Sequence, residues 1–285
     1  MLPGRYSYTL VVDGVKIFDP LNPLIRRISA VNPQGGSVNV VEIKDDEPQP
    51  WDFYSDIPHG TMVLEKFYSK TLNQVKGCAL YLPPGYQSTH QYPILYLLHG
   101  SGGDYLSWFF DMNLDNLMDY LRSNGAVPEM IVVMPDGHEG TIGTLLQPYS
   151  QTSSEDNGER RRREYIRHVS YFVNDVIPFI ESKYNVSPEF RAIAGLSMGG
   201  YQTTHLITTH PDLFHAAGIF SAGAEESVLT RFSSVKDHLS KYRLVYLSCG
   251  NWDFLFDQSK ALSKMLNELG ISHVYYARAH LSESM

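Results

Sequence analysis

A serine flanked by glycines follows a short apolar stretch and precedes a predicted helix. The run from Ile193 to Gly200 reads Ile-Ala-Gly-Leu-Ser-Met-Gly-Gly, a G-x-S-x-G motif centred on Ser197. A strand-to-helix turn of this kind exposes the serine hydroxyl at the carboxyl edge of a sheet, and small neighbours relieve crowding. The free amides at the helix N-terminus then face developing negative charge. The motif predicts Ser197 as a nucleophile rather than as part of a structural glycine turn.

A second glycine-rich segment ends the central apolar stretch of the chain. Residues 97–103 read Leu-Leu-His-Gly-Ser-Gly-Gly. In the architecture that carries G-x-S-x-G turns, an amide after this strand and the amide after the nucleophile together bind the oxyanion. We therefore expect the N–H groups of Ser101 and Met198 to form an oxyanion hole. The alternative is an ordinary glycine-rich loop.

The acid and the base of such a site follow the serine in the sequence. Asp253 lies just beyond a predicted strand end and is expected to orient the base, with Asp257 as the alternative acid. Either aspartate could instead begin a helix. Only His273 and His280 come after Asp253, and His273 opens the last apolar run, as a residue at a strand start would. We predict His280 as the base, although a histidine near a chain end is often inert.

Short apolar runs alternate with helical patterns, which favours a mostly parallel sheet between layers of helices. Two further runs, at 61–71 and 74–82, are typical of an antiparallel pair. The predicted buried strands are 92–98, 130–134, 191–194, 216–220, 244–248 and 273–277. The predicted helices are 108–122, 169–184, 199–209 and 258–269. A biased polar stretch at 147–163 is predicted to be a loop.

The first part of the chain has a different pattern. Alternating residues around Asp13-Gly14 predict a β-hairpin, and a further strand is expected near 37–43. An acidic, proline-rich stretch follows and is typical of a linker. We therefore divide the chain into a β segment at 1–46, a linker at 47–58 and an α/β domain at 59–285.

Composition excludes several classes of function. The chain has 285 residues, 43% of them hydrophobic, and a net charge of −8, which argues against nucleic acid or an anionic membrane as partner. Cys78 and Cys249 have no C-x-x-C spacing, so a disulfide scaffold and a cysteine-rich zinc site are excluded. The arginine run at 160–163 is flanked by glutamates and predicts a solvated face. His138 has no partner at metal-ligand spacing, and no signal peptide is visible at the N-terminus.

The run from His59 to Ala277 resembles the esterase D-like branch of the α/β-hydrolases. It is most similar to the feruloyl esterases and acetyl xylan esterases of carbohydrate esterase family 1. The matching pieces are Tyr-Leu-Pro-Pro-Gly-Tyr at 81–86, Leu-Tyr-Leu-Leu-His-Gly at 95–100, the helix with Trp108, Asn-Asp-Val-Ile-Pro-Phe-Ile at 174–180, Gly-Leu-Ser-Met-Gly-Gly at 195–200, and Gly250 with Asp253.

This resemblance implies an α/β-hydrolase three-layer sandwich and a Ser-His-Asp acyl-enzyme mechanism without metal or organic cofactor. It implies release of feruloyl or acetyl groups from a xylan-type polysaccharide or oligosaccharide, and an extracellular or periplasmic location. Trp108, Tyr149 and Trp252 are the candidate substrate-binding residues. The N-terminal residues resemble the end of an immunoglobulin-like domain, so that 1–46 is expected to be a partial β-sandwich.

The chain departs from the family at both ends. The front of the sandwich is absent, and a Gly-Gly-His followed by a tryptophan-containing helix is replaced by Tyr-Tyr-Ala-Arg-Ala-His-Leu-Ser at 275–282. We therefore expect a C-terminal truncation. Three alternatives stay open: an esterase for siderophores or S-formylglutathione, a catalytically impaired carbohydrate-binding relative, and a transferase that uses a sugar hydroxyl in place of water.

Overall fold

The computed structural model describes residues 4–26, 38–138, 157–224 and 226–278. An eight-stranded sheet runs through the middle of the chain in the order β13-β12-β11-β10-β8-β9-β7-β6. The six strands from β13 to β9 are parallel to one another, and β7 and β6 join them as antiparallel strands. The strands are β6 (Thr61–Ser69), β7 (Gln74–Leu82), β8 (Tyr92–Leu98), β9 (Ile131–Pro135), β10 (Val186–Leu196), β11 (Ala216–Phe220), β12 (Leu244–Gly250) and β13 (Val274–Arg278).

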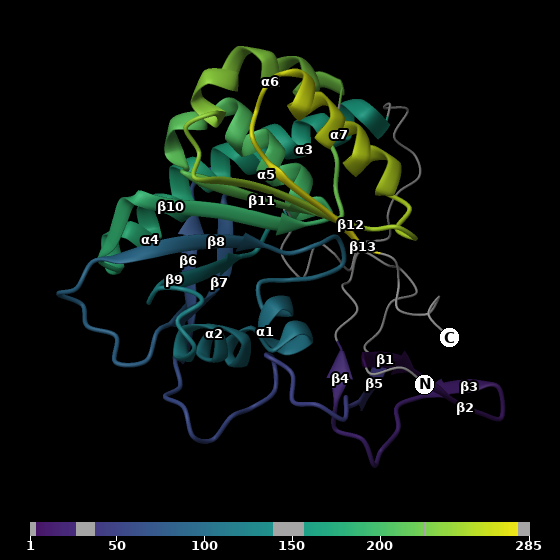
Figure 1. Cartoon of the computed structure of the whole chain (residues 1–285). Coiled ribbons are helices and arrows are strands. Elements are labelled where there is room, and N and C mark those ends of the chain that lie inside the picture. The colour runs from purple at the N-terminus through teal and green to yellow at the C-terminus, as the bar shows by residue number, and fades with distance from the viewer. Residues whose placement is uncertain (1–3, 27–37, 139–156, 225, 279–285) are drawn as a thin grey trace.

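Helices cover both faces of this sheet (Figure 1). The larger core lies between the sheet and the helices α3 to α7, and the smaller one lies between the sheet and the pair α1 and α2. The helices are α1 (Ser107–Met112), α2 (Leu114–Ser123), α3 (Asn157–Tyr171), α4 (Ile177–Lys183), α5 (Met198–Thr209), α6 (Glu226–Leu239) and α7 (Phe256–Glu268), with a π-helical turn at Phe172–Val176 and a 3₁₀ turn at Pro211–Leu213. The expected α/β architecture is therefore confirmed.

Helix α5 is buried along almost its whole length, from Gly199 to Thr208. Buried residues, polar as well as apolar, lie on all sides of the helix rather than on one stripe, as is typical of a helix covered from several directions. It packs on the ends of β8, β10 and β11 and is itself covered by α3 and α6. Because α5 starts directly at the end of β10, this central helix fixes the residue between them.

Two helices that the sequence pattern predicts as continuous are interrupted. Asn113, with a left-handed φ of 47°, separates α1 from α2, and its N–H donates to the Phe109 carbonyl. Asparagine tolerates this conformation better than most residues, so the expected helix at 108–122 ends and restarts there. The expected helix at 169–184 contains a π-helical turn ahead of Pro178, which lacks the N–H for a regular helix.

The polar stretch at 147–163 is not a loop throughout, because α3 already begins at Asn157. Its arginines at 160–163 therefore lie on a helix. That these arginines form a solvated face, as the glutamates on either side of the run indicate, stays a prediction.

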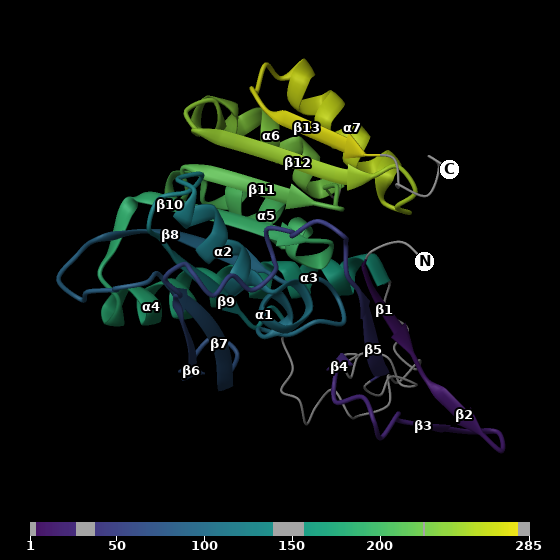
Figure 2. The ribbon, with the colours of Figure 1, turned by 60° about the horizontal axis from the view of Figure 1, so that its bottom comes forward.

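The N-terminal residues form small antiparallel pairs next to the carboxyl edge of the main sheet (Figures 1 and 2). The predicted hairpin is present as β2 (Leu10–Val12) and β3 (Val15–Ile17), with Asp13 and Gly14 both at positive φ, as a type I′ turn requires. A three-stranded sheet of β1 (Gly4–Tyr8), β5 (Val38–Ile43) and β4 (Ile25–Arg26) completes the segment. Its relation to an immunoglobulin-like domain, like the division at 46 and 58, stays a prediction.

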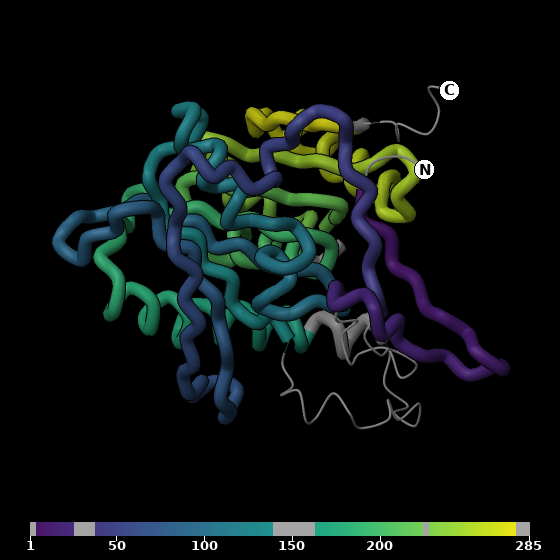
Figure 3. The backbone as a smooth tube through the Cα atoms, turned by 90° about the horizontal axis from the view of Figure 1, so that it is seen from below, coloured from purple at the N-terminus to yellow at the C-terminus, as the bar shows by residue number. Residues whose placement is uncertain are grey.

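One arginine joins this segment to the main domain. The Arg5 guanidinium donates to the carbonyls of Phe110 and Asp111 at 2.6 and 3.1 Å and to Asn113 Oδ1 at 2.8 Å. These are the last residues of α1 and its C-cap, where carbonyls lack helical partners and a cation is favourable. The stretch after β5 then crosses the α1–α2 face of the sheet to reach β6 (Figure 3). There the Trp51 carbonyl accepts hydrogen bonds from Asn113 and Asn116.

Among the described residues, the two cysteines are free and buried, and no helix has the length and apolar character needed to cross a membrane.

A histidine lies in the larger core without a hydrogen-bond partner among the described residues. His168, on α3, is 3% exposed, and both of its ring nitrogens are unsatisfied. Burial, together with the proximity of His99 and Lys76, lowers the pKa of His168 to about 3. His168 is therefore neutral in the folded protein, whereas in the unfolded chain its imidazole binds a proton more readily.

We predict that His168 makes the fold sensitive to mild acid. Because its pKa is depressed in the folded state, its contribution to stability falls as the pH drops below the ordinary value near 6.5. Between pH 7 and pH 5 this loss is about 2 kcal/mol. Urea denaturation at pH 7 and at pH 5 gives the free energy of unfolding at each pH. Its fall between the two pH values should be about 2 kcal/mol smaller in His168→Leu than in wild type. The exposed control His90→Gln should lose as much as wild type, and equal losses in all three proteins would contradict the prediction.

Candidate functional site

The serine of the G-x-S-x-G motif occupies a sharp turn between β10 and α5. Ser197 has φ 52° and ψ −114°, a conformation that non-glycine residues seldom adopt. Its N–H donates to the Phe220 carbonyl at 2.8 Å, and its carbonyl accepts from the Tyr201 N–H at 3.0 Å. The ends of β11 and of the first turn of α5 thus hold the backbone in this strained geometry, as the sequence motif requires.

The glycines of the motif are needed because backbone atoms approach them closely. A Cβ on Gly195 would lie 2.2 Å from the Gly199 carbonyl oxygen, and one on Gly199 would lie 2.6 Å from the Leu98 carbonyl oxygen. Both contacts are with backbone, which cannot move aside as a flexible side chain can. The serine turn and the end of β8 therefore come together only with glycine at 195 and 199.

The loop after β8 runs beside the serine. A Cβ on Gly100 would lie 3.5 Å from Ser197 Cβ, so Gly100 and Ser197 are neighbours. The loop closes a turn in which the Gly103 N–H donates to the Gly100 carbonyl at 3.0 Å, with Gly102 at φ 87°. Ser101 is exposed at the tip of this turn, and Met198 is the first residue of α5. The two predicted oxyanion donors thus belong to adjacent segments.

A cleft of about 330 Å³ opens beside this loop. Its walls combine the loop after β8, the end of β10 and one side of α1. The lining residues are His99, Gly100, Ser101, Gly102, Gly103, Ser107, Trp108, Asp111, Met112 and Leu196. The indole of Trp108, a predicted substrate-binding residue, and the thioether of Met112 supply apolar surface for a flat ligand.

The predicted acid lies at the same edge of the sheet. Asp253 follows the end of β12, which is parallel to β10 and separated from it by β11 alone. Its Oδ1 accepts from the Leu255 N–H at 2.8 Å, and its carbonyl accepts from the Phe256 N–H at 2.9 Å. Asp253 therefore also stabilises the turn that leads into α7, whose N-cap is Leu255. The alternative acid, Asp257, is exposed in the first turn of that helix.

Three other predicted residues have different positions. His280 and Tyr149 lie outside the described residues. Trp252 is 67% exposed beside Asp253. The alternative base, His273, precedes β13 at the amino-terminal edge of the sheet, where it contacts Ser263 Oγ at 2.8 Å. His273 is therefore at a strand start, as the sequence indicated. That edge of the sheet is opposite the one that carries Ser197.

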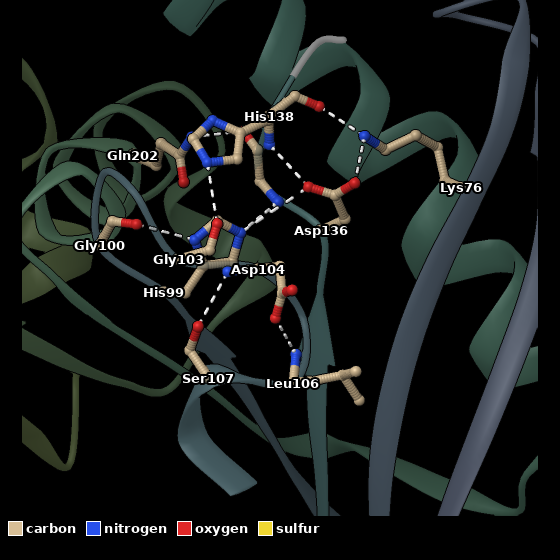
Figure 4. Close-up of polar contacts among 11 residues, drawn as sticks. Lys76, His99, Gly100, Gly103, Asp104, Leu106, Ser107, Asp136, His138 and Gln202 are labelled. Carbon is tan, nitrogen blue, oxygen red and sulfur yellow. Dashed lines mark hydrogen bonds and ion pairs between the residues drawn. The ribbon is translucent and has the colours of Figure 1, made fainter. Parts of the chain in front are cut away.

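A cluster of buried charged and polar groups lies under the loop after β8 (Figure 4). Lys76 Nζ, on β7, is 2.8 Å from Asp136 Oδ2, and the Lys76 side chain is 1% exposed. His99 and His138 complete the cluster. Burial raises the pKa of Asp136, but the contacts with His99 and Lys76 lower it more, so the carboxyl is well below its usual range. Burial and the proximity of His99 lower the pKa of His138 to about 4.

The sequence analysis recognised only part of this cluster. Asp136 and His138 closely follow the predicted strand at 130–134, and His99 belongs to the glycine-rich segment at 97–103, so the sequence alone places these three near the site. Lys76 was missed, although a signal for it exists. In β7 it shares one face with Cys78 and Leu80, both fully buried, so strand alternation already places this lysine toward the core.

Within the described ranges, no group of three His, Cys, Asp or Glu side chains is arranged to hold a metal ion.

Known proteins are similar to this chain in sequence and in fold. The chain is 26% identical over 260 residues to an endo-1,4-β-xylanase/feruloyl esterase from Xylanibacter ruminicola, which covers 88% of this chain and 32% of the relative. The chain therefore spans about a third of that relative's length. A solved CE1 ferulic acid esterase from Anaeromyces mucronatus aligns with a TM-score of 0.66 at 20% identity, over 82% of this chain and 88% of that one. A ferric enterobactin esterase from Salmonella typhimurium aligns with a TM-score of 0.63 at 18% identity, over 92% and 63%.

At these identities the two solved structures establish the fold alone. They show that the eight-stranded sheet and its helices have the α/β-hydrolase fold. A family model with the description "Putative esterase" matches residues 69–238, which is more than half of the chain. The chain belongs to this esterase family, and within it resembles the feruloyl esterases.

The serine turn should not tolerate a methyl group at Gly195. Because the added Cβ would lie 2.2 Å from a backbone oxygen, Gly195→Ala must displace α5 or β10. We expect a loss of stability of roughly 2 kcal/mol or more, seen as a lower midpoint in thermal denaturation followed by circular dichroism. As a matched control, Gly250→Ala has no heavy atom within 4 Å of its Cβ and should leave the midpoint within a few degrees. A tolerated Gly195→Ala would contradict the geometry.

Proposed function

We propose that this chain is a serine carboxylic-ester hydrolase that releases hydroxycinnamoyl groups, such as feruloyl, or acetyl groups from a xylan-type polysaccharide. One observation carries the choice of substrate: the relative named as an endo-1,4-β-xylanase/feruloyl esterase matches 88% of this chain. The strained Ser197 beside the glycine loop supports the choice of reaction. An extracellular location goes with such a polymeric substrate.

The proposed reaction has two acyl-transfer steps. Ser197 Oγ attacks the ester carbonyl carbon while its proton passes to the base, for which sequence order favours His280. The tetrahedral oxyanion accepts hydrogen bonds from the amides of Ser101 and Met198. The base then returns the proton to the departing sugar hydroxyl, leaving an acyl-serine. Water attacks this acyl-serine with the same base accepting its proton, and the carboxylic acid leaves as Ser197 Oγ regains a proton. Asp253 orients the base.

The cleft suits a flat acyl group. It begins at Gly100 and Ser101, beside the serine, and extends along α1 to Trp108 and Met112. A volume of about 330 Å³ is at the low end of small-molecule sites, so one aromatic ring with its acyl chain is a reasonable occupant. The sugar would then lie outside the cleft, where the exposed Trp252 is a candidate contact.

Removal of the nucleophile tests the reaction. With methyl ferulate and 4-nitrophenyl acetate as substrates, Ser197→Ala should lower kcat by at least about 10⁴-fold, because no other group can form the acyl-enzyme. Initial rates by absorbance are the measurement, and circular dichroism should show an unchanged fold. Activity of Ser197→Ala near that of wild type would reject Ser197 as the nucleophile. His280→Ala in the same assay tests the base, and full activity there would reject it.

A second experiment tests the acyl group. Because Trp108 lines the cleft, Trp108→Ala should raise KM for methyl ferulate about tenfold while changing KM for 4-nitrophenyl acetate less than about twofold. Wild-type kcat/KM is measured in parallel for S-formylglutathione and for a catecholate triester, since the similarity to an enterobactin esterase fold motivates that alternative. Faster turnover of either one than of methyl ferulate would move the substrate class away from plant cell-wall esters.

A further inference from the structure

A lysine is buried below the active-site loop without any role in the acyl-transfer chemistry. Lys76 Nζ donates to Asp136 Oδ2 at 2.8 Å and to the His138 carbonyl at 2.5 Å, and the Tyr171 ring lies 5.7 Å away. A fully buried lysine is rare, and removing its charge from water costs several kcal/mol. Apolar residues of similar size usually stabilise a core as well as such a pair does. Stability alone therefore does not explain why a buried lysine–aspartate pair lies at this position.

The second oxygen of Asp136 faces His99. Asp136 Oδ1 accepts from the His138 N–H at 3.1 Å and lies 3.8 Å from His99 Nε2, beyond hydrogen-bond distance. His99 Nε2 instead accepts from the Gly137 N–H at 2.9 Å. The other ring nitrogen, Nδ1, lies 2.9 Å from the Gly100 carbonyl, to which it can only donate. These two contacts together require the tautomer of His99 that carries its proton on Nδ1.

Both ends of the oxyanion turn are held by this cluster. His99 Nδ1–H donates to the Gly100 carbonyl, and His138 Nε2 lies 3.1 Å from the Gly103 carbonyl. Gln202 Nε2, from α5, donates to the Gly137 carbonyl at 2.9 Å and so fixes the strand end that carries the Gly137 N–H (Figure 4). The peptide unit that links Gly100 to Ser101 contains the predicted oxyanion donor. The orientation of the Gly100 carbonyl therefore also sets the direction of the Ser101 N–H, because the peptide is planar.

We propose that Lys76 is a positioning residue: by balancing the Asp136 carboxylate, it keeps His99 in its Nδ1–H tautomer and thereby aims the Ser101 N–H at the oxyanion. This rests on the proposed function for the Ser101 amide. The ammonium of Lys76 balances the carboxylate that faces His99 Nε2. Without the Lys76 ammonium, the Asp136 carboxylate would favour a proton on His99 Nε2. This new N–H would point at the Gly137 N–H, so two hydrogen-bond donors would face each other. The strand end and the turn would have to separate, and the Gly100 peptide would lose its fixed orientation.

The test compares two substitutions with their combination. In Lys76→Met the Asp136 carboxylate is unbalanced, and kcat for methyl ferulate should fall roughly 10- to 100-fold with KM within about threefold of wild type, as expected for a donor that acts only in the transition state. In Lys76→Met/Asp136→Asn no charge remains to attract a proton to Nε2, so kcat should recover at least tenfold. A merely structural pair would predict the opposite order, with the double variant at least as impaired as the single one.

The tautomer is read directly by ¹⁵N NMR on protein labelled at histidine, with the His99 signals assigned by their absence in His99→Asn. Wild type and the double variant should show the Nδ1–H form, and Lys76→Met should show a proton on Nε2. Lys183→Met is the matched control, since it breaks the 2.7 Å ion pair with Glu65 on the surface and should change neither kcat nor the His99 signals.

The two readouts separate this proposal from the proposed function. If wild type hydrolyses the ester and Lys76→Met matches it in both kcat and tautomer, the positioning role is wrong. If wild type hydrolyses no ester, the proposed function fails, and the His99 tautomer alone then supports or overturns the role of Lys76. If Lys76→Met does not fold, Asp136→Asn and the double variant decide, because the proposal requires the Nδ1–H form in both.

Discussion

The close approach between the end of β8 and the start of α5 is the constraint on which the site depends. The Gly199 backbone lies so near the carbonyls of Leu98 and His99 that a Cβ would come within 3 Å of either oxygen. This contact brings the loop after β8 against the serine turn, and it forces Ser197 into a conformation with positive φ. Strain of this kind persists only where the surrounding structure determines the backbone. Here a buried central helix and parallel strands on both sides of β10 do so.

The first part of the loop after β8, residues 99–103, has little apolar side-chain surface of its own, because three of these five residues are glycine. Its shape therefore depends on hydrogen bonds to polar groups buried below it, chiefly His99, His138 and the Lys76–Asp136 pair. The antiparallel pairing of β7 with β9, in which Cys78 faces Pro135, brings the lysine and the aspartate together. A sheet position that would normally be apolar carries a charge here, and the site lies directly above it.

The outer wall of the cleft depends on segments far apart in the chain. Helix α1, which carries Trp108 and Met112, has no buried residue of its own. Arg5 from the N-terminal β segment binds its last carbonyls, and the Trp51 carbonyl from the stretch before β6 accepts hydrogen bonds from Asn113 and Asn116. The N-terminal residues thus help to hold the helix that forms the outer wall of the cleft.

The sequence alone determined the features that depend on residues close together in the chain. The alternation of apolar runs with helical patterns predicted the α/β architecture, and Gly195-Leu196-Ser197-Met198-Gly199 predicted the strained turn, because both depend on neighbours in sequence. The break at Asn113 and the π-helical turn at Phe172–Val176 were not predicted, since they depend on single residues, Asn113 and Pro178, rather than on the apolar periodicity of the helix. The Lys76–Asp136–His99 cluster was decided only by the tertiary structure. Its members come from three strands of the sheet, and the strand register that joins them is a long-range property that no local pattern encodes.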